Sequence, residues 1–512
     1  MATPTELELS ASEARHRAAR GAMSVLGRHA LVRLLAFVGT LALARLIAPA
    51  EFGLFAASQF VLTVLQAIAV GGITAALIRR REMLLAADYR VALTLQQTAT
   101  AIIIITILTS APKIATHWED SAGLTPIIQA MALALFPISL RSIPFAMLQR
   151  ALRHDRTTIC EIIEYIVYLV IAIGGAAYGL GVWALVAATL LRHTTGATVA
   201  YLLVHSRPRF DFELPRALEL MRFALPLQGQ MLIDLAQRSV IPVVIGLFFG
   251  AAAVGIASMA NTMLEALLLQ PLVMLAGVQF RLFSRIQDDP QAVGALLERS
   301  IAAGAMVFLP PVLFLGIIAP VLMPHVLSSQ WANVGELIRS LTAVSAIQVL
   351  AVPTAQAAKA LGQTRALLVG GLAGFAIQVA LVSLLAQPLG LTSYPIAATI
   401  GVAANFAFVF LAVGRRVGMR PIRSVFPIIG GLALTGAIWW TAIATMTSFP
   451  LIGAACLAGG LVYLIVVVAF SGRHLAALLR FASSTAPFRA QGQIRALATW
   501  VEGKCLMSGA QP

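Results

Sequence analysis

The chain has 512 residues, of which 59% are hydrophobic and only 11% are charged, and its mean hydropathy is +0.89. This composition excludes a soluble globular protein, because there is too little polar surface to cover one of this size. The formal net charge of +15 does not by itself indicate a nucleic-acid partner, because in a membrane protein the meaning of the charges depends on where they lie. The apolar runs are long and do not alternate with polar residues, which favours helices over a closed barrel.

Apolar windows of about twenty residues predict an all-α integral membrane protein with about fourteen transmembrane helices. In chain order the predicted helices cover 22–47, 54–78, 91–111, 123–148, 158–177, 181–204, 218–248, 253–280, 295–324, 333–358, 365–387, 394–414, 424–446 and 450–471. The first twenty residues mix acidic and basic side chains, which is not the pattern of a cleavable signal peptide.

Most of the 36 lysines and arginines lie in alternate connections between these helices, whereas the opposite connections contain only Lys113. The positive-inside rule therefore predicts that both termini of this inner-membrane protein lie in the cytoplasm. No connection is long enough for a domain outside the membrane, so we expect the protein to act within the bilayer.

An internal repeat is visible at a nearly constant spacing. Pro144–Arg156 and Pro353–Arg365 share a proline, an alanine-leucine pair and two basic positions at a spacing of 209, and Ala187–Thr189 recurs as Ala397–Thr399. Ala50–Gly53 likewise corresponds to Ala252–Gly255. Two copies of six helices have the same orientation, which predicts two parallel lobes around a central cleft that works by alternating access.

The repeat predicts an N-terminal lobe at 1–216, a C-terminal lobe at 217–420, and two additional helices at 421–472. A basic and mildly amphipathic tail follows at 473–512, for which an interfacial position on the inner leaflet and a disordered end are both open.

Several polar residues fall inside the predicted helices, where an unpaired charge costs about 3 kcal/mol or more. The candidate substrate-binding residues of the cleft are Arg33, Arg45, Arg192, Arg238, Gln59, Gln66, Gln230 and Asn261. A cationic cleft fits a substrate that carries phosphate or diphosphate. The alternatives are structural: Asp234 and Arg238 are four residues apart and can simply pair, and single amides often only join helices.

Asp234 and Glu265 are the candidates for coupling to a proton or sodium gradient. Glu161 and Glu164 are expected to stay solvated or to pair with Arg153 or Arg156 at a cytoplasmic helix end. No cofactor or metal site is expected: Cys160, Cys456 and Cys505 are scattered, and there is no Walker-type phosphate loop.

The segments Leu43–Phe55 and Ala75–Arg80 resemble the opening of bacterial polysaccharide and oligosaccharide flippases of the MOP superfamily, often called Wzx-type transporters. Leu148-Gln149-Arg150, and Ala360-Leu361-Gly362 with Arg365, resemble two further landmarks of that family. The resemblance implies export of undecaprenyl-diphosphate-linked repeat units for O-antigen, capsule or exopolysaccharide. Arg33, Arg45 and Arg238 are the positions that match the family's cationic cavity.

The same resemblance implies lipid-linked oligosaccharide and membrane lipids as partners, with a polysaccharide polymerase and co-polymerase as candidate protein partners and no nucleic acid. Two other branches of the superfamily, lipid II flippases and multidrug extruders, stay open, although the arginine excess argues against a cation extruder. A membrane glycan polymerase or glycosyltransferase is disfavoured by the short outer connections, of which only Lys113–Gly123 carries adjacent acids.

Overall fold

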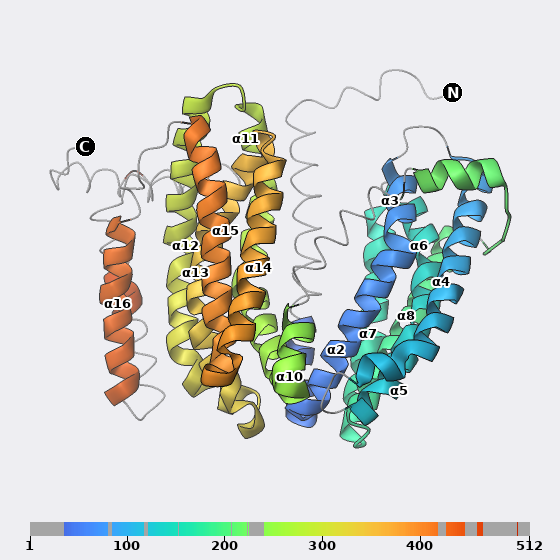
Figure 1. Cartoon of the computed structure of the whole chain (residues 1–512), viewed down its shortest axis with the longest axis horizontal. Helices are drawn as coiled ribbons and strands as arrows, with labels where there is room; N and C mark the ends of the chain where they lie inside the picture. Colours follow the sequence, from blue (N-terminus) through green and yellow to red (C-terminus); the bar gives the residue numbers. More distant parts are fainter. Residues whose placement is uncertain are drawn as a thin grey trace. The chain divides into compact units, whose positions relative to one another are not determined.

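The computed structural model describes residues 35–79, 84–116, 121–151, 153–205, 207–222, 224, 240–417, 426–445, 458–463 and 499. Within these residues every regular element is a helix (Figure 1). The chain divides into two compact units, residues 1–255 and 256–512, which we call unit 1 and unit 2.

The first helix that the structure describes in unit 1 is short and apolar and covers Leu35–Leu46. The next helix, α2, begins at Pro49, where the missing N–H of proline costs nothing because the first turn has no intrahelical acceptor for it. A π-helical segment, η2, follows α2 directly. The elements are α2 (Pro49–Gln66), η2 (Ala67–Gly71), α3 (Gly72–Arg79), α4 (Ala86–Ala115), α5 (Ser121–Leu133), α6 (Leu135–Arg150), α7 (His154–Ala177), α8 (Val182–Val204) and η3 (Val240–Ile245).

The helix α10 begins in unit 1 and continues into unit 2. A π-helical segment, η4, follows α10 directly, just as η2 follows α2. The elements are α10 (Gly246–Leu264), η4 (Glu265–Leu269), α11 (Gln270–Arg285), α12 (Pro290–Val326), η5 (Ser329–Trp331), α13 (Ala332–Ala360), α14 (Thr364–Leu389), η6 (Gly390–Thr392), α15 (Ser393–Val417) and α16 (Phe426–Thr445).

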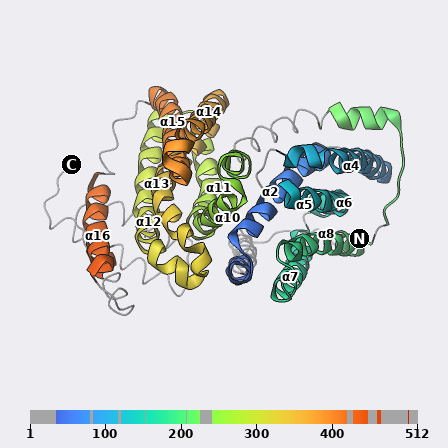
Figure 2. The ribbon, with the colours of Figure 1, turned by 60° about the horizontal axis from the view of Figure 1, so that its bottom comes forward.

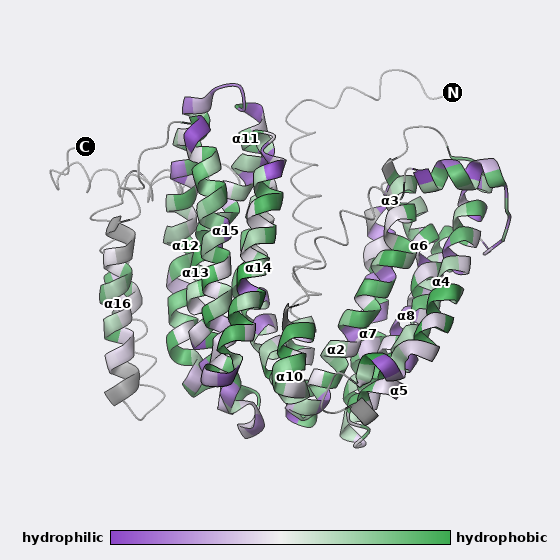
Figure 3. Ribbon diagram, viewed as in Figure 1, coloured by the Kyte–Doolittle hydropathy of each residue, from purple (hydrophilic) through white to green (hydrophobic). Residues whose placement is uncertain are grey.

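Eight helical stretches in the described part of the chain are long and apolar enough to cross a membrane, and one of them, Thr364–Val417, contains both α14 and α15. The helices are apolar along their length and polar toward their ends (Figure 3). The chain is therefore a multi-pass membrane protein, as the sequence predicts. Predicted spans 54–78 to 181–204 and 253–280 to 424–446 each coincide with an observed helix. The total of fourteen stays a prediction, because parts of the other spans lie outside the described residues.

The same helix pairs pack together in each unit. In unit 1, α3, α4 and α8 contact α6, and α7 contacts α8; in unit 2, α11, α12 and α15 contact α13, and α14 contacts α15. Figure 2 shows α7 beside α8 and α14 beside α15. Gly181 and Gly390, which are 209 residues apart, both have a positive φ, of 53° and 55°. Each lies at the turn before the last helix of its repeat, α8 in the first repeat and α15 in the second. These features support the internal repeat.

A pair of glycines allows α2 and α10 to touch. A Cβ atom on Gly53 would overlap the carbonyl oxygen of Ala251, and one on Gly255 would overlap the carbonyl oxygen of Pro49. Small residues permit this close backbone approach, which is the usual way for membrane helices to gain dispersion contacts. Gly53 and Gly255 are the two positions that the repeat aligns.

At one end of unit 1, α6 and α8 finish and α4 and α7 begin; we call this the basic end. Arg150 at the end of α6 donates to the carbonyl of Leu77 at 2.8 Å, and Arg156 in α7 donates to that of Leu203 at 2.6 Å. In unit 2, Arg416 donates to the carbonyl of Leu361 at 2.8 Å, which is a bond of the same kind. These arginines therefore satisfy carbonyls that the last turns of neighbouring helices leave open.

Candidate functional site

A buried ionic cluster joins three helices of unit 1. The Glu164 side chain in α7 is 1% exposed and accepts two hydrogen bonds from one terminal nitrogen of Arg141 in α6, at 2.5 and 2.6 Å. The Nε of Arg192 in α8 lies 3.8 Å from Oε2 of the same carboxylate, which is one of the two oxygens that Arg141 contacts. Two guanidinium groups therefore surround one carboxylate, and the cluster has a formal charge of +1.

All three charged residues lie deep within their helices. Glu164 is ten residues from the start of α7, Arg141 is nine residues from the end of α6, and Arg192 is twelve residues from the end of α8. At 1.5 Å per residue these positions are about 13–18 Å from the basic end. The hydrocarbon core is about 30 Å thick, so the cluster lies near mid-membrane.

Local sequence makes room for the carboxylate. A Cβ atom on Gly196 in α8 would overlap the carboxylate of Glu164, so only glycine leaves that space. Cys160, one turn earlier in α7, is fully buried and lies 3.4 Å from the Gly196 carbonyl and 3.5 Å from the Glu164 carboxylate. Cys160 therefore packs against the ionic cluster as a small buried side chain.

Glu164 balances the positive charge of Arg141 and leaves most of the positive charge of Arg192 uncompensated. Arg141 holds the carboxylate at hydrogen-bond distance, whereas Arg192 Nε is 3.8 Å away and makes no hydrogen bond within the described residues. The Arg192 side chain is 36% exposed, and its guanidinium carbon lies 5.7 and 5.8 Å from the ring centres of Tyr165 and Tyr168. An exposed guanidinium flanked by aromatic rings can bind an anionic group and a sugar face together.

Three of the other predicted site residues are described in unit 1. Arg45 is exposed near the end of the first helix, and Gln59 and Gln66 are half-buried in α2. The structure does not bring them into the ionic cluster: of the predicted site residues that the structure describes, only Arg192 belongs to it.

Two further predicted residues lie in unit 2. Asn261 in α10 donates to the hydroxyl of Tyr394 in α15 at 3.1 Å and to the Ala257 carbonyl at 2.8 Å. Glu265 is exposed, at the first position of η4 and one turn after Asn261. The predicted residues Arg33, Arg238, Gln230 and Asp234 lie outside the described residues, and the predicted cleft between the lobes stays a prediction.

The expectation for Glu164 was wrong. Instead of a solvated carboxylate near Arg153 or Arg156, Glu164 is a fully buried partner of Arg141 and Arg192, whereas Glu161 is exposed as expected. Arg141, Glu164, Tyr165 and Tyr168 are therefore site residues that sequence reasoning missed. The depth of these residues could have indicated the cluster, because Arg141, Glu164 and Arg192 lie at similar heights along three consecutive helices.

The amides of α4 have a structural role. Gln96 donates to Thr74 at 3.0 Å and to the Val70 carbonyl of η2 at 3.4 Å, and accepts from Ser142 at 2.6 Å. It thereby satisfies a carbonyl of the π-helical segment η2, where the regular hydrogen-bond ladder is interrupted. Among the described residues, no group of three or more histidine, cysteine or acidic side chains is arranged to hold a metal ion.

The chain is similar to known proteins over most of its length. Residues 42–336 match the family described as polysaccharide biosynthesis protein. The succinoglycan biosynthesis transport protein ExoT of Rhizobium meliloti (strain 1021) is 25% identical over 299 residues, which are 58% of this chain and 60% of that relative. The matched region thus spans about three fifths of the length of the curated relative.

Two solved structures share the fold. The lipid II flippase MurJ in its inward closed conformation covers 86% of this chain and 96% of its own, with a TM-score of 0.70 and 13% identity. An inward-facing multidrug transporter of the MATE family of the MOP superfamily covers 76% and 98%, with a TM-score of 0.59 and 17% identity. Since the family match extends over more than half of the sequence, the chain belongs to the polysaccharide biosynthesis protein family, and its fold is that of MOP-superfamily transporters.

Proposed function

We propose that this protein moves an undecaprenyl-diphosphate-linked oligosaccharide from the cytoplasmic to the periplasmic leaflet of the bacterial inner membrane. The single observation that carries the proposal is the family match over residues 42–336. Because ExoT is named as a succinoglycan biosynthesis transport protein, transport for the synthesis of a polysaccharide is the role that we propose to test first.

The ionic cluster supports an anionic substrate. A guanidinium that is partly exposed near mid-membrane is stable only if its exposed side faces water or a bound anion, because contact with lipid tails costs about 3 kcal/mol or more. Arg192 is such a group, and it lies beside Tyr165 and Tyr168. In the proposed cycle Arg192 contacts the diphosphate while the tyrosine rings contact the sugar that follows it.

The membrane potential can assist this direction of transport. Two negative charges that move outward down an inside-negative potential release about 4–5 kcal/mol per 100 mV. We also propose Asp234 and Glu265 as the positions at which proton or sodium coupling is tested. If Asp234→Asn and Glu265→Gln both support full transport, neither carboxylate couples an ion gradient.

The proposed function is tested in a strain from which the gene is deleted. We expect loss of one cell-surface polysaccharide and accumulation of its lipid-linked repeat unit in the cytoplasmic leaflet, measured by accessibility to a membrane-impermeant glycan probe in oriented vesicles. Re-expression restores both. Unchanged polysaccharide together with increased drug sensitivity contradicts the proposal and favours a multidrug extruder. Unchanged polysaccharide together with accumulated lipid II favours a lipid II flippase.

Arg192→Gln tests the role of the cluster in the same strain. We expect at least a 10-fold loss of transport with normal protein abundance, because a charged hydrogen bond to phosphate is removed. Arg339→Gln is the matched control: Arg339 is also partly exposed, pairs with Glu336 and lies 5.7 Å from the ring of Trp440, and it belongs to unit 2. Equal losses for both variants contradict a specific role for Arg192.

A further inference from the structure

A second basic site lies at the basic end of unit 1, apart from the mid-membrane cluster. It is a cavity of about 430 Å³ whose polar lining comes from α4, α8 and the segment that follows α8. The polar residues that line it are Tyr89, Arg90, Tyr201, His205, Arg207 and Arg209. Its floor is apolar, with Leu93 from α4 and Ile143 and Met147 from α6.

The cavity carries uncompensated positive charge. Arg90 lies 3.6 Å from Asp211, in a pair whose side chains are 39% and 37% exposed. Arg207 and Arg209 are exposed, and neither makes an ion pair with any residue that the structure describes. At least two guanidinium groups are thus available to an anion that enters the cavity.

A buried hydroxyl gives an independent sign of a ligand. The Tyr201 hydroxyl is shielded from solvent and has no hydrogen-bond partner in the described part of the chain. Buried hydroxyl groups are nearly always hydrogen-bonded, because leaving one unpaired costs about 1–3 kcal/mol. A phosphate oxygen in the cavity would accept this hydrogen bond once the Tyr201 side chain, which lines the cavity, turns its hydroxyl toward the ligand.

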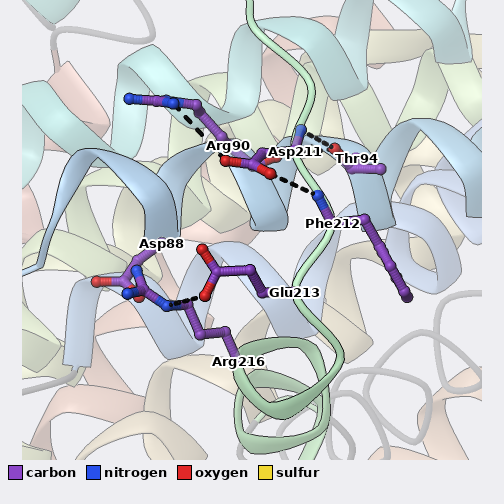
Figure 4. A network of polar contacts seen from close by, with 7 residues as sticks. All are labelled: Asp88, Arg90, Thr94, Asp211, Phe212, Glu213 and Arg216. Atoms are coloured by element: carbon purple, nitrogen blue, oxygen red, sulfur yellow. Dashed lines mark hydrogen bonds and ion pairs between the residues drawn. The ribbon is translucent and has the colours of Figure 1, made fainter.

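The segment that carries Arg207 and Arg209 is fastened in place by its own polar contacts (Figure 4). His205 ends α8 in the left-handed region, with φ of 53°, which turns the chain away from the helix axis. The Asp211 backbone N–H then donates to Thr94 at 3.0 Å.

Arg216 extends the same attachment to α4, at 2.6 Å from Glu213 and 3.4 Å from Asp88. The segment is therefore held against α4 by residues that do not line the cavity. The backbone that carries Arg207 and Arg209 is therefore positioned without a ligand, which lowers the ordering cost of binding one.

The surroundings of the cavity favour a lipid as the ligand. Phe210 and Phe212 are 63% and 59% exposed, directly beside Arg209. The helix over residues 214–222, green in Figure 1, lies across the ends of α3 and α4. It packs Leu220 into unit 1 and leaves Leu214 and Leu218 exposed. Exposed apolar side chains among arginines, at the ends of membrane-spanning helices, are typical of contact with the headgroup region of a bilayer.

We propose that this cavity binds the phosphate-bearing headgroup of a membrane lipid with net negative charge, with Arg207, Arg209 and the Tyr201 hydroxyl as its ligands. The lipid tail lies beside Phe210 and Phe212. Phospholipids and polyprenyl diphosphate both carry negatively charged phosphate groups that these residues could bind. The proposed site therefore does not depend on the proposed function. On the proposed orientation it opens to the cytoplasmic leaflet.

The test uses the full chain, purified in a neutral detergent, with lipid binding measured by native mass spectrometry. We expect saturable binding of phosphatidylglycerol, of polyprenyl diphosphate or of both, and none of phosphatidylcholine. Arg207→Gln with Arg209→Gln lowers the affinity about 30-fold, the factor for two basic residues at an anionic surface. Arg281→Gln with Arg285→Gln removes the same charge from exposed positions of α11 and leaves the affinity unchanged.

Two further variants distinguish a site from general attraction. Tyr201→Phe removes only the buried hydroxyl and lowers the affinity about 5-fold; unchanged binding in this variant overturns the cavity as the site. Phe210→Ser with Phe212→Ser weakens the binding of lipids but not of inorganic pyrophosphate. If pyrophosphate binds as tightly as either lipid, the ligand is a soluble phosphate and the lipid assignment fails. Equal losses in the α11 control also overturn the proposal.

Discussion

The pairs α7–α8 and α14–α15 occupy the same place in the two repeats but are held together differently. Between α7 and α8 the contact contains Glu164 and Arg192, with Arg141 from α6. Between α14 and α15 it contains Gly374 and Gly401, where a Cβ atom on either would lie 2.6 Å from the other's carbonyl oxygen.

The spacing of 209 places Leu350, Ala373 and Gly401 opposite Arg141, Glu164 and Arg192. One repeat therefore carries three charges where the other carries only apolar or small residues. Since this helix pair packs in unit 2 without an ion pair among the described residues, with the glycine contact and one hydrogen bond from Gln363 to the Ala412 carbonyl, packing does not require the ionic cluster of unit 1. Ionic groups near mid-membrane are expensive, and their presence in one copy indicates a function that is confined to that copy.

The largest expected effect comes from leaving the two arginines without their carboxylate. Glu164→Ala should lower the free energy of unfolding by about 3–5 kcal/mol, because Arg141 becomes a buried charge without a counter-ion. The measurement is the unfolding equilibrium of the purified protein in lipid bicelles. Glu161→Ala, on an exposed face of the same helix, is the control and should change stability little.

The comparison predicts a rescue. Arg141→Leu with Glu164→Ala gives unit 1 the residues that unit 2 has at these positions, and it should recover most of the lost stability, because an ion pair replaced as a whole often costs little. Transport should stay impaired. If the double variant is no more stable than Glu164→Ala, the two helix pairs are not interchangeable in packing.

A smaller effect is expected in unit 2. Gly401→Ala places a methyl group against the Gly374 carbonyl, and the helices must separate, which should cost about 1–3 kcal/mol. The same unfolding measurement reports it. At Gly277 in α11 an added Cβ meets nothing within 4 Å, so Gly277→Ala should be neutral or slightly stabilising. Equal changes for the two variants would show that α14 and α15 do not depend on this approach.

Much of the fold could be predicted from the sequence, because apolar length alone decides where a helix crosses the bilayer. The repeat could be predicted too, since Gly53 and Gly255 align and prove to lie where α2 and α10 touch. The ionic cluster could not. Arg141 and Glu164 are 23 residues apart in the sequence, and whether they meet depends on the rotation of α6 and α7 about their axes, which hydropathy does not specify.

The π-helical segments η2 and η4 could not be predicted from the sequence either. The contact at η2 gives the smallest expected difference between the two repeats. In unit 1 the Gln96 amide contacts the Val70 carbonyl in η2, whereas no corresponding side-chain bond to η4 occurs among the described residues of α12. Gln96→Leu should lower the free energy of unfolding by about 1 kcal/mol, the usual value of one polar contact between membrane helices.

Hydrogen exchange of the Val70 region, measured by mass spectrometry, should increase in this variant while exchange around η4 stays unchanged. Gln129→Leu is the control: its amide donates to Leu108 at 2.9 Å, between α5 and α4 and outside η2, so exchange at η2 should not respond. Unaltered exchange at Val70 in Gln96→Leu would mean that η2 is maintained without the Gln96 contact, and the two repeats would then be equivalent at this position.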